Sequence, residues 1–129
     1  MAKQIIHTDK APAAVGPYSQ AVATNAGRTV YLSGQIGLEP GTGELISENF
    51  EGQVRQSFAN MQAVIEEAGG TLADIVKLTL FLTDLSKFAS ANAIMADVIP
   101  QPFPARSTLG VASLPKGAQF EVEAVVVLS

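Results

Sequence analysis

The 129-residue chain contains no cysteine and no tryptophan, and His7 is its only histidine. The lack of cysteine excludes disulfides, thiolate metal sites, iron–sulfur clusters and cysteine nucleophiles. A zinc site or a Ser-His-Asp triad would have to be built around the single imidazole of His7. That residue follows the apolar pair Ile5 and Ile6, a pattern typical of an exposed strand end. We therefore expect no thiol-based centre, and a histidine-based centre is disfavoured.

Basic residues are also few, because eight Lys and Arg stand against twelve Asp and Glu, for a net charge of −4. They are scattered along the chain, whereas nucleic-acid binding depends on clustered basic side chains that neutralise phosphates. The longest aliphatic run, residues 124–128, is far too short to cross a bilayer, and the first residues lack the apolar stretch of a signal peptide. We therefore expect a cytoplasmic protein that binds neither nucleic acid nor a membrane.

Hydrophobic residues make up 47% of the chain and charged residues 16%, as in a folded globule. No repeat or linker divides the sequence, so we expect a single domain over residues 1–129. Periodicity and turn residues predict the order β-β-β-α-β-α-β-β, an α+β fold with both helices on one face of a single sheet. The predicted strands are residues 5–8, 19–23, 29–33, 75–83, 105–111 and 120–128, and the predicted helices are 49–68 and 86–98. Residues 25–27 predict a hairpin turn between the second and third strands.

Alternation along the strands assigns their side chains to two sheet faces. Val76 and Leu78 are assigned to the core side of the fourth strand, and Leu109 and Val111 to the core side of the fifth. The opposite face would then hold Ile75, Lys77, Thr79, Phe81, Arg106, Thr108, Gly110, Glu121, Glu123, Val125 and Val127. A face that mixes apolar and charged residues in this way is typical of a self-association interface around a polar site.

Arg106 and Glu121 are the main candidates for chemistry. The planar guanidinium of Arg106 could hold a substrate carboxylate through two parallel hydrogen bonds, or could form a structural ion pair with Glu121 or Glu123. A glutamate among valines could have its pKa raised by desolvation or lowered by a nearby arginine, and the spacing does not give the sign. Tyr18, in a constrained Gly-Pro-Tyr-Ser-Gln segment, could be a pocket wall or a loop anchor.

Four sequence blocks closely resemble the RidA (YjgF) family and occur in that family's order. They are Ala-Pro-Ala-Ala-Val-Gly-Pro-Tyr-Ser-Gln (11–20), Leu-Ser-Gly-Gln-Ile (32–36), Phe-Pro-Ala-Arg-Ser (103–107) and Leu-Pro-Lys-Gly-Ala-Gln-Phe-Glu-Val-Glu-Ala (114–124). The resemblance covers essentially the whole chain. It implies a chorismate-mutase-like fold and a homotrimer with three sites between subunits. It also implies hydrolysis of 2-iminopropanoate and 2-iminobutanoate to 2-oxo acids and ammonia, without a cofactor or metal.

The resemblance further implies roles for individual residues. Arg106 would bind the substrate carboxylate, and Glu121 would orient or activate the water that attacks the imine carbon. The pocket would be shaped by Tyr18, Ser33, Gly34 and Asn92, and the main-chain N–H of Thr108 would help to hold the substrate. Many family members carry cysteine where this chain has Thr108, but a main-chain contact does not need the thiol. Imine hydrolysis passes through a carbinolamine, so it requires a positioned water and proton transfer rather than a covalent nucleophile.

Two other functions stay open from the sequence. A regulatory protein that binds small 2-oxo acids without turnover would need Arg106 but would have no use for Glu121. A ribonuclease or translation inhibitor is disfavoured by the acidic charge and the single histidine. The presence of both Arg106 and Glu121 favours the deaminase.

Overall fold

The computed structural model describes residues 3–129, and their secondary structure follows the predicted order. The strands are β1 (Lys3–Ile6), β2 (Ala21–Thr24), β3 (Arg28–Tyr31), β4 (Ile75–Leu82), β5 (Ala105–Gly110) and β6 (Phe120–Leu128). The helices are α1 (Phe50–Glu67) and α2 (Phe88–Val98), and the second is preceded by a 3₁₀ turn, Leu85–Lys87. No helix within residues 3–129 is long and apolar enough to cross a bilayer.

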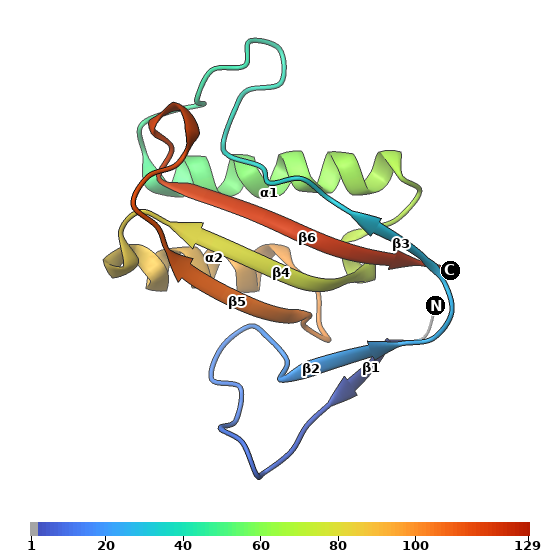
Figure 1. Ribbon diagram of the computed structural model, residues 1–129. Coiled ribbons are helices and arrows are strands. Elements are labelled where there is room, and N and C mark those ends of the chain that lie inside the picture. Colours follow the sequence, from blue (N-terminus) through green and yellow to red (C-terminus); the bar gives the residue numbers. More distant parts are fainter. Residues whose placement is uncertain (1–2) are drawn as a thin grey trace.

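Four strands form one sheet in the order β3-β6-β4-β5. β4 and β5 are parallel, because α2 carries the chain back across the sheet between them, while the other neighbours are antiparallel. Both helices lie behind this sheet and its front face is uncovered, as Figure 1 shows. The prediction of two helices on one face of a sheet is thus confirmed. The predicted single sheet was wrong, because β1 and β2 pair with each other in a separate two-stranded sheet.

The hairpin predicted at residues 25–27 was wrong, because β2 pairs with β1 and β3 pairs with β6. The segment instead leads from a two-stranded ribbon, β1-β2, to the main sheet (Figure 1). Gly27 is required in this segment for another reason, because a Cβ at this position would lie 2.6 Å from the carbonyl oxygen of Leu128. The glycine therefore permits a close backbone approach to the end of β6.

The ribbon is attached to the main sheet by polar contacts. The ammonium group of Lys3 donates to the carbonyl oxygens of Ala73, Ile75 and Pro102 at 3.3, 3.2 and 3.1 Å.

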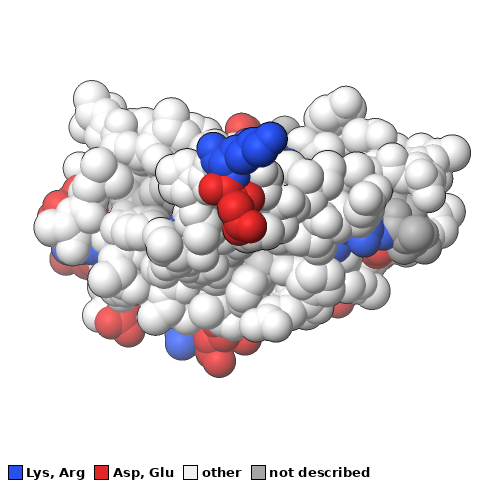
Figure 2. Space-filling view, turned by 90° about the horizontal axis from the view of Figure 1, so that it is seen from below, with Lys and Arg blue, Asp and Glu red and all other residues white. Residues whose placement is uncertain are grey.

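Seen from below, on the ribbon side, the surface is largely uncharged apart from one mixed group near its centre and the margins (Figure 2). Ile5 and Ile6 are exposed on this ribbon.

The core lies between α1 and the sheet, as the helical spacing of its apolar residues predicts. Asn49 caps α1 by accepting a hydrogen bond from the main-chain N–H of Gly52 at 2.9 Å. Val54, Phe58, Met61 and Ile65 are buried on one side of the helix. They pack against the core face of β6, where Phe120, Val122 and Ala124 alternate with outward-facing residues.

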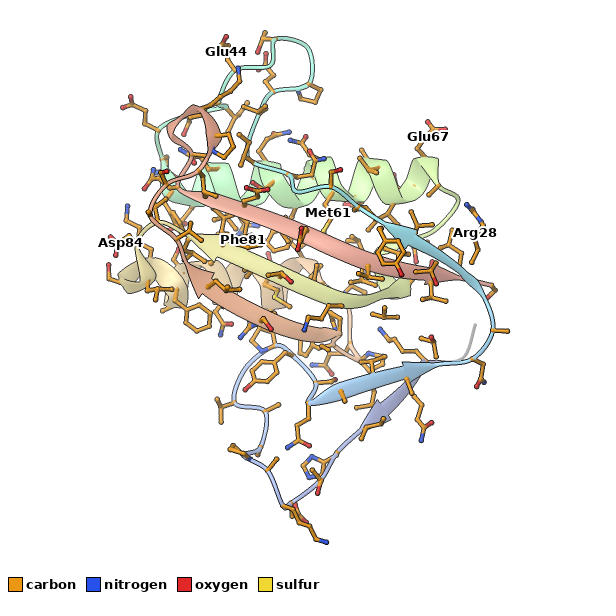
Figure 3. All side chains as sticks on the ribbon, in the orientation of Figure 1. Arg28, Glu44, Met61, Glu67, Phe81 and Asp84 are labelled. Atoms are coloured by element: carbon orange, nitrogen blue, oxygen red, sulfur yellow. The ribbon has the colours of Figure 1, made fainter. Side chains whose placement is uncertain are left out.

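Two predicted face assignments are corrected by the strand registers. A bulge between Ile75 and Lys77 places Ile75 in the core, so Val76 does not take the core position predicted for it. In the parallel pair, Arg106 aligns with Leu78 and Thr108 with Leu80, which are both core residues. Arg106 and Thr108 therefore point to the helix side. Leu109 instead aligns with Phe81, which is labelled in Figure 3 and lies on the uncovered face. Leu109 is 44% exposed.

Candidate functional site

The guanidinium of Arg106 lies between two aromatic rings on the helix side of β5. Its Cζ is 4.8 Å from the ring centroid of Tyr18 and 5.3 Å from that of Phe88. Its Nη1 donates to Oδ1 of Asn92 at 2.6 Å and contacts Sδ of Met95 at 3.6 Å. These contacts fix the plane and position of the guanidinium before any ligand arrives.

The N-terminal loop brings Tyr18 to this place. Ser19 anchors the loop, because its main-chain N–H donates to the carbonyl oxygen of Pro104 at 2.9 Å and its hydroxyl to that of Phe103 at 2.6 Å. Tyr18 itself closes a tight turn through a 2.8 Å bond from its N–H to the carbonyl oxygen of Gly16. Tyr18 is thus part of an anchored loop and its ring lies against the guanidinium of Arg106, while its role as a pocket wall stays a prediction.

Arg106 has no carboxylate partner among residues 3–129, where the ion pairs are His7–Asp9 and Arg55–Asp97. The structural ion pair with Glu121 or Glu123 is therefore not formed within the chain. Burial lowers the pKa of Arg106, and the nearby Tyr18 opposes this shift only in part. A partly desolvated guanidinium without a counter-ion can bind an anionic ligand, because a carboxylate would replace the stabilisation that the cation loses when water is removed.

Thr108 follows Arg106 on the same side of β5. The N–H of Val111 donates to the carbonyl oxygen of Leu82, so main-chain groups of odd-numbered residues in this segment face β4. The N–H of Thr108 consequently faces the outer edge of the sheet, where it can donate to a ligand. The hydroxyl oxygen of Thr108 is closed to solvent and has no hydrogen-bond partner among the described residues.

Glu121 lies on the uncovered face of the sheet, opposite Phe81 in β4. Glu123 shares this face two residues along, as the sequence predicts. The carboxyl of Glu121 packs against Gly34, where the added Cβ of any other residue would collide with it, and Ser33 is the exposed neighbour of that glycine. Burial raises the pKa of Glu121, and repulsion from Glu123 raises it further. The sign of the shift, open from the sequence, is thus upward.

The predicted site residues fall into two groups on opposite faces of the sheet. Arg106, Tyr18, Asn92 and Thr108 gather on the helix side at β5, whereas Glu121, Gly34 and Ser33 gather on the uncovered side at β6. Sequence reasoning missed two residues of the first group, Phe88 and Met95. Their spacing with Asn92 in α2 (i, i+4, i+7) was the available signal, because such residues share one face of a helix.

Within residues 3–129 no three His, Cys, Asp or Glu side chains come together in a way that could hold a metal ion. The two groups of site residues present a guanidinium, a carboxyl, an amide, hydroxyls and main-chain N–H groups. Such a set can bind a carboxylate, position water and exchange a proton.

Comparison with known proteins gives long and consistent matches. Residues 8–128 match the family described as Endoribonuclease L-PSP. Two proteins named 2-iminobutanoate/2-iminopropanoate deaminase are similar to the chain. The one from Dermatophagoides farinae is 46% identical over 98% of this chain and 97% of its own length. The one from Homo sapiens is 42% identical over 97% and 90%, respectively.

The fold comparison agrees with these matches. A crystal structure of RidA from an Antarctic Psychrobacter bacterium is 50% identical and superposes with a TM-score of 0.76 over 97% of this chain and 99% of that one. The chain therefore belongs to the family described as Endoribonuclease L-PSP, the RidA (YjgF) family that its sequence blocks resemble.

Proposed function

We propose that this protein hydrolyses small 2-imino acids, among them 2-iminopropanoate and 2-iminobutanoate, to 2-oxo acids and ammonia. The observation that carries this proposal is the unpaired guanidinium of Arg106, which aromatic rings and Asn92 hold in place. Two similar proteins are named for this reaction. The acidic charge and scattered basic residues do not favour a nucleic acid substrate, although the family description contains the word endoribonuclease.

Arg106 binds the substrate carboxylate in this proposal. One terminal nitrogen, Nη1, already donates to Asn92, so the remaining N–H groups of the planar fork can donate to a carboxylate side-on. The outward-facing N–H of Thr108 provides a further donor along the strand. Two-point binding of this kind fixes the imine carbon relative to the protein, which is the main requirement for attack by a positioned water.

Glu121 handles the water and its protons. In the reaction, water adds to the C=N carbon and gives a carbinolamine, and the C–N bond then breaks to release ammonia and leave a C=O bond. A carboxylate accepts a proton from the attacking water and can return it to the departing nitrogen. The raised pKa of Glu121 suits this exchange, because proton transfer is most effective when the pKa lies closer to the working pH.

The two groups of residues complete each other only in an assembly. Arg106 and Glu121 face opposite sides of one sheet, so one chain does not present both to the same ligand. A homotrimer that buries the uncovered sheet faces, with β6 of one subunit beside the outer edge of β5 of the next, would bring Glu121 of one subunit near Arg106 of another. The exposed Tyr31 and Leu109 on that face, 78% and 44% exposed, favour such burial.

The proposal is tested by a coupled assay. A threonine dehydratase generates 2-iminobutanoate through its enamine, and the rate of 2-oxobutanoate formation is followed with and without the protein. We expect the protein to accelerate this step in proportion to its concentration. Binding of 2-oxobutanoate without any acceleration would instead identify a non-catalytic binding protein.

A further inference from the structure

Lys87 lies where the chain enters α2, and its side chain crosses to the start of β6. Its ammonium group donates to Oε1 of Gln119 at 2.8 Å and lies 5.4 Å from the ring centroid of Phe50. The start of α2 and the start of β6 lie at the same end of the sheet, as Figure 1 shows. The hydrogen bond therefore joins two elements across residues that are 32 positions apart in the sequence.

A cation is not favoured at this position for local reasons. Lys87 immediately precedes the first turn of α2, where the helix dipole opposes a positive charge. Its side chain makes no capping hydrogen bond, and it forms no ion pair with any residue in the described range 3–129. The charge is stabilised instead by the amide oxygen of Gln119 and the ring of Phe50. A residue that is locally unfavourable but held by distant partners indicates a role in the placement of α2.

Gln119 is a firmly held partner, because its other polar groups are also bonded. Its side-chain Nε2 donates to the carbonyl oxygen of Glu48 at 2.8 Å. Its main-chain N–H donates to Oε1 of Gln53 at 2.9 Å, and its carbonyl oxygen accepts a hydrogen bond from the N–H of Thr83 at 3.2 Å. The amide of Gln119 is therefore not free to follow Lys87, and the bond between them holds the start of α2 in place.

The same helix supplies residues that hold Arg106. The ring of Phe88, the residue after Lys87, lies 5.3 Å from Cζ of Arg106. One turn later, Oδ1 of Asn92 accepts a hydrogen bond from Nη1 at 2.6 Å, and Met95 contacts the same nitrogen at 3.6 Å. Residues three and four positions apart share one face of a helix, so a rotation of α2 would move all three contacts together.

We propose that Lys87 is a positioning residue for imine hydrolysis. Its hydrogen bond to Gln119 fixes α2, and α2 holds the guanidinium of Arg106 ready for the substrate carboxylate. This inference rests on the proposed function and adds to it a residue that touches no substrate. Arg106 binds the carboxylate in the ground state and in the transition state alike, so loss of its alignment weakens both complexes. A variant without the hydrogen bond should therefore have a raised KM and an unchanged kcat.

Lys87→Met tests this role, because methionine keeps a long unbranched side chain but cannot donate a hydrogen bond. We expect this variant to raise KM for 2-iminobutanoate and Kd for 2-oxobutanoate about fivefold, with kcat within about twofold of the parent. Lys87→Arg keeps a charged donor and should retain both parent constants. The matched control is Lys116→Met, because Lys116 donates to the carbonyl oxygen of a loop residue, Gly43, at 3.1 Å. This control should leave both constants unchanged.

A double-mutant cycle shows whether the hydrogen bond carries the effect. Gln119→Met removes the acceptor, and we expect it to raise Kd for 2-oxobutanoate as much as Lys87→Met does. The double variant should bind as weakly as either single variant, because the same contact is lost in all three. Circular dichroism verifies that each variant is folded. Additive effects of the two substitutions on Kd would overturn the proposal.

The measurements separate this inference from the proposed function. If Lys87→Met binds 2-oxobutanoate as the parent does, or lowers kcat at unchanged KM, the inference is overturned while imine hydrolysis stands. If the parent binds 2-oxobutanoate but hydrolyses no imine, the proposed function is overturned, and weaker binding by Lys87→Met still supports its role in placing Arg106. A parent that neither binds nor hydrolyses overturns both. If Lys87→Met does not fold, the comparison of Gln119→Met with Lys116→Met decides.

Discussion

At the scale of single residues, the surroundings of Arg106 and Glu121 shift the pKa of each side chain from its ordinary value. The Arg106 cation is partly desolvated among Tyr18, Phe88 and Met95 and has no counter-ion among the described residues. The Glu121 carboxyl is pressed against Gly34 and repelled by Glu123. Burial lowers the pKa of Arg106, so a bound anion would stabilise its charge. Burial and Glu123 raise the pKa of Glu121, so this carboxyl takes up a proton more readily. The two residues are therefore the first targets for substitution.

Replacing Arg106 by lysine keeps the charge but removes the planar fork. We expect Arg106→Lys to lose on the order of 100-fold in kcat/KM for 2-iminobutanoate, because a misplaced substrate carboxylate misplaces the reacting carbon. Arg55→Lys is the matched control, since Arg55 forms only an exposed ion pair with Asp97 at 3.4 Å. Steady-state kinetics of both variants, with circular dichroism to verify folding, would decide. Wild-type turnover in Arg106→Lys would make Arg106 a structural residue.

Glu121 and Glu123 lie on the same face, so their comparison tests position rather than charge. We expect Glu121→Gln to reduce kcat by about 100- to 10,000-fold, because the amide cannot exchange a proton. Binding of 2-oxobutanoate should persist in this variant, since Arg106 is intact. Glu123→Gln should retain most of the activity. The mechanism would be wrong if Glu123→Gln proved to be the inactive variant in the same assay.

The raised pKa of Glu121 also predicts a pH-dependent effect on stability. A carboxyl whose pKa is higher in the folded chain favours folding when it is protonated, and this contribution is lost as pH rises through the folded-state pKa. Glu121→Gln should therefore unfold at a higher temperature than the parent at neutral pH. The difference should vanish at a pH below the ordinary glutamate value. Thermal unfolding followed across this range tests the sign, and a lower unfolding temperature of the variant at neutral pH would contradict it.

At the scale of elements, a buried glutamine joins α1 to the start of β6. Gln53 is 1% exposed, accepts a hydrogen bond from the N–H of Gln119 at 2.9 Å and donates to the carbonyl oxygen of Ser47 at 3.0 Å. Gln119 lies two residues before Glu121. This side chain therefore helps to position the strand that carries the proposed water-handling carboxyl.

We expect Gln53→Leu to lower the free energy of unfolding by about 1–3 kcal/mol, because it leaves partly buried main-chain groups of Ser47 and Gln119 without partners. Gln62→Leu is the control, since Gln62 bonds only to Glu66 on the exposed side of α1 and surface changes usually stay within about 0.5 kcal/mol. Urea unfolding of the two variants measures the difference. Equal midpoints would show that Gln53 is not a structural link.

The same scale shows what the sequence can predict. The spacing of Val54, Phe58 and Met61 predicts α1, because a helix buries residues on one side regardless of what it packs against. The partner of β3 and the side on which Arg106 points could not be obtained in this way. Both depend on register, which is decided between distant strands, and a single bulge at Val76 reverses the assignment of its neighbour Ile75. The sequence motifs identified the candidate site residues. The structure was needed to show that these residues lie on two opposite faces of the sheet.

At the scale of the whole molecule, the uncovered sheet face predicts self-association. We expect a homotrimer in sedimentation experiments, with each site receiving Arg106 from one subunit and Glu121 from another. Mixing two inactive variants tests this directly. After joint unfolding and refolding of Arg106→Lys with Glu121→Gln, random trimers should recover about a quarter of the wild-type activity, because about a quarter of sites combine two intact residues.

A mixture of Arg106→Lys with the unrelated surface variant Arg55→Lys provides the control for dilution of active sites. The double variant Arg106→Lys/Glu121→Gln mixed with wild-type protein provides a second control, because it places both changes in one chain. Absence of any recovery in the complementing mixture, with trimers present, would mean that both residues act from the same subunit.

The separation of the two groups by the sheet has one more consequence. In the proposed mechanism, the residues that bind the carboxylate all belong to one chain, whereas the carboxyl that exchanges protons would come from a neighbouring chain. Dilution should then uncouple affinity from turnover: dissociated chains would still capture 2-oxo acids but would no longer release ammonia from imines. The same polypeptide would thus act as a metabolite buffer when scarce and as a catalyst when abundant, with its own concentration as the switch.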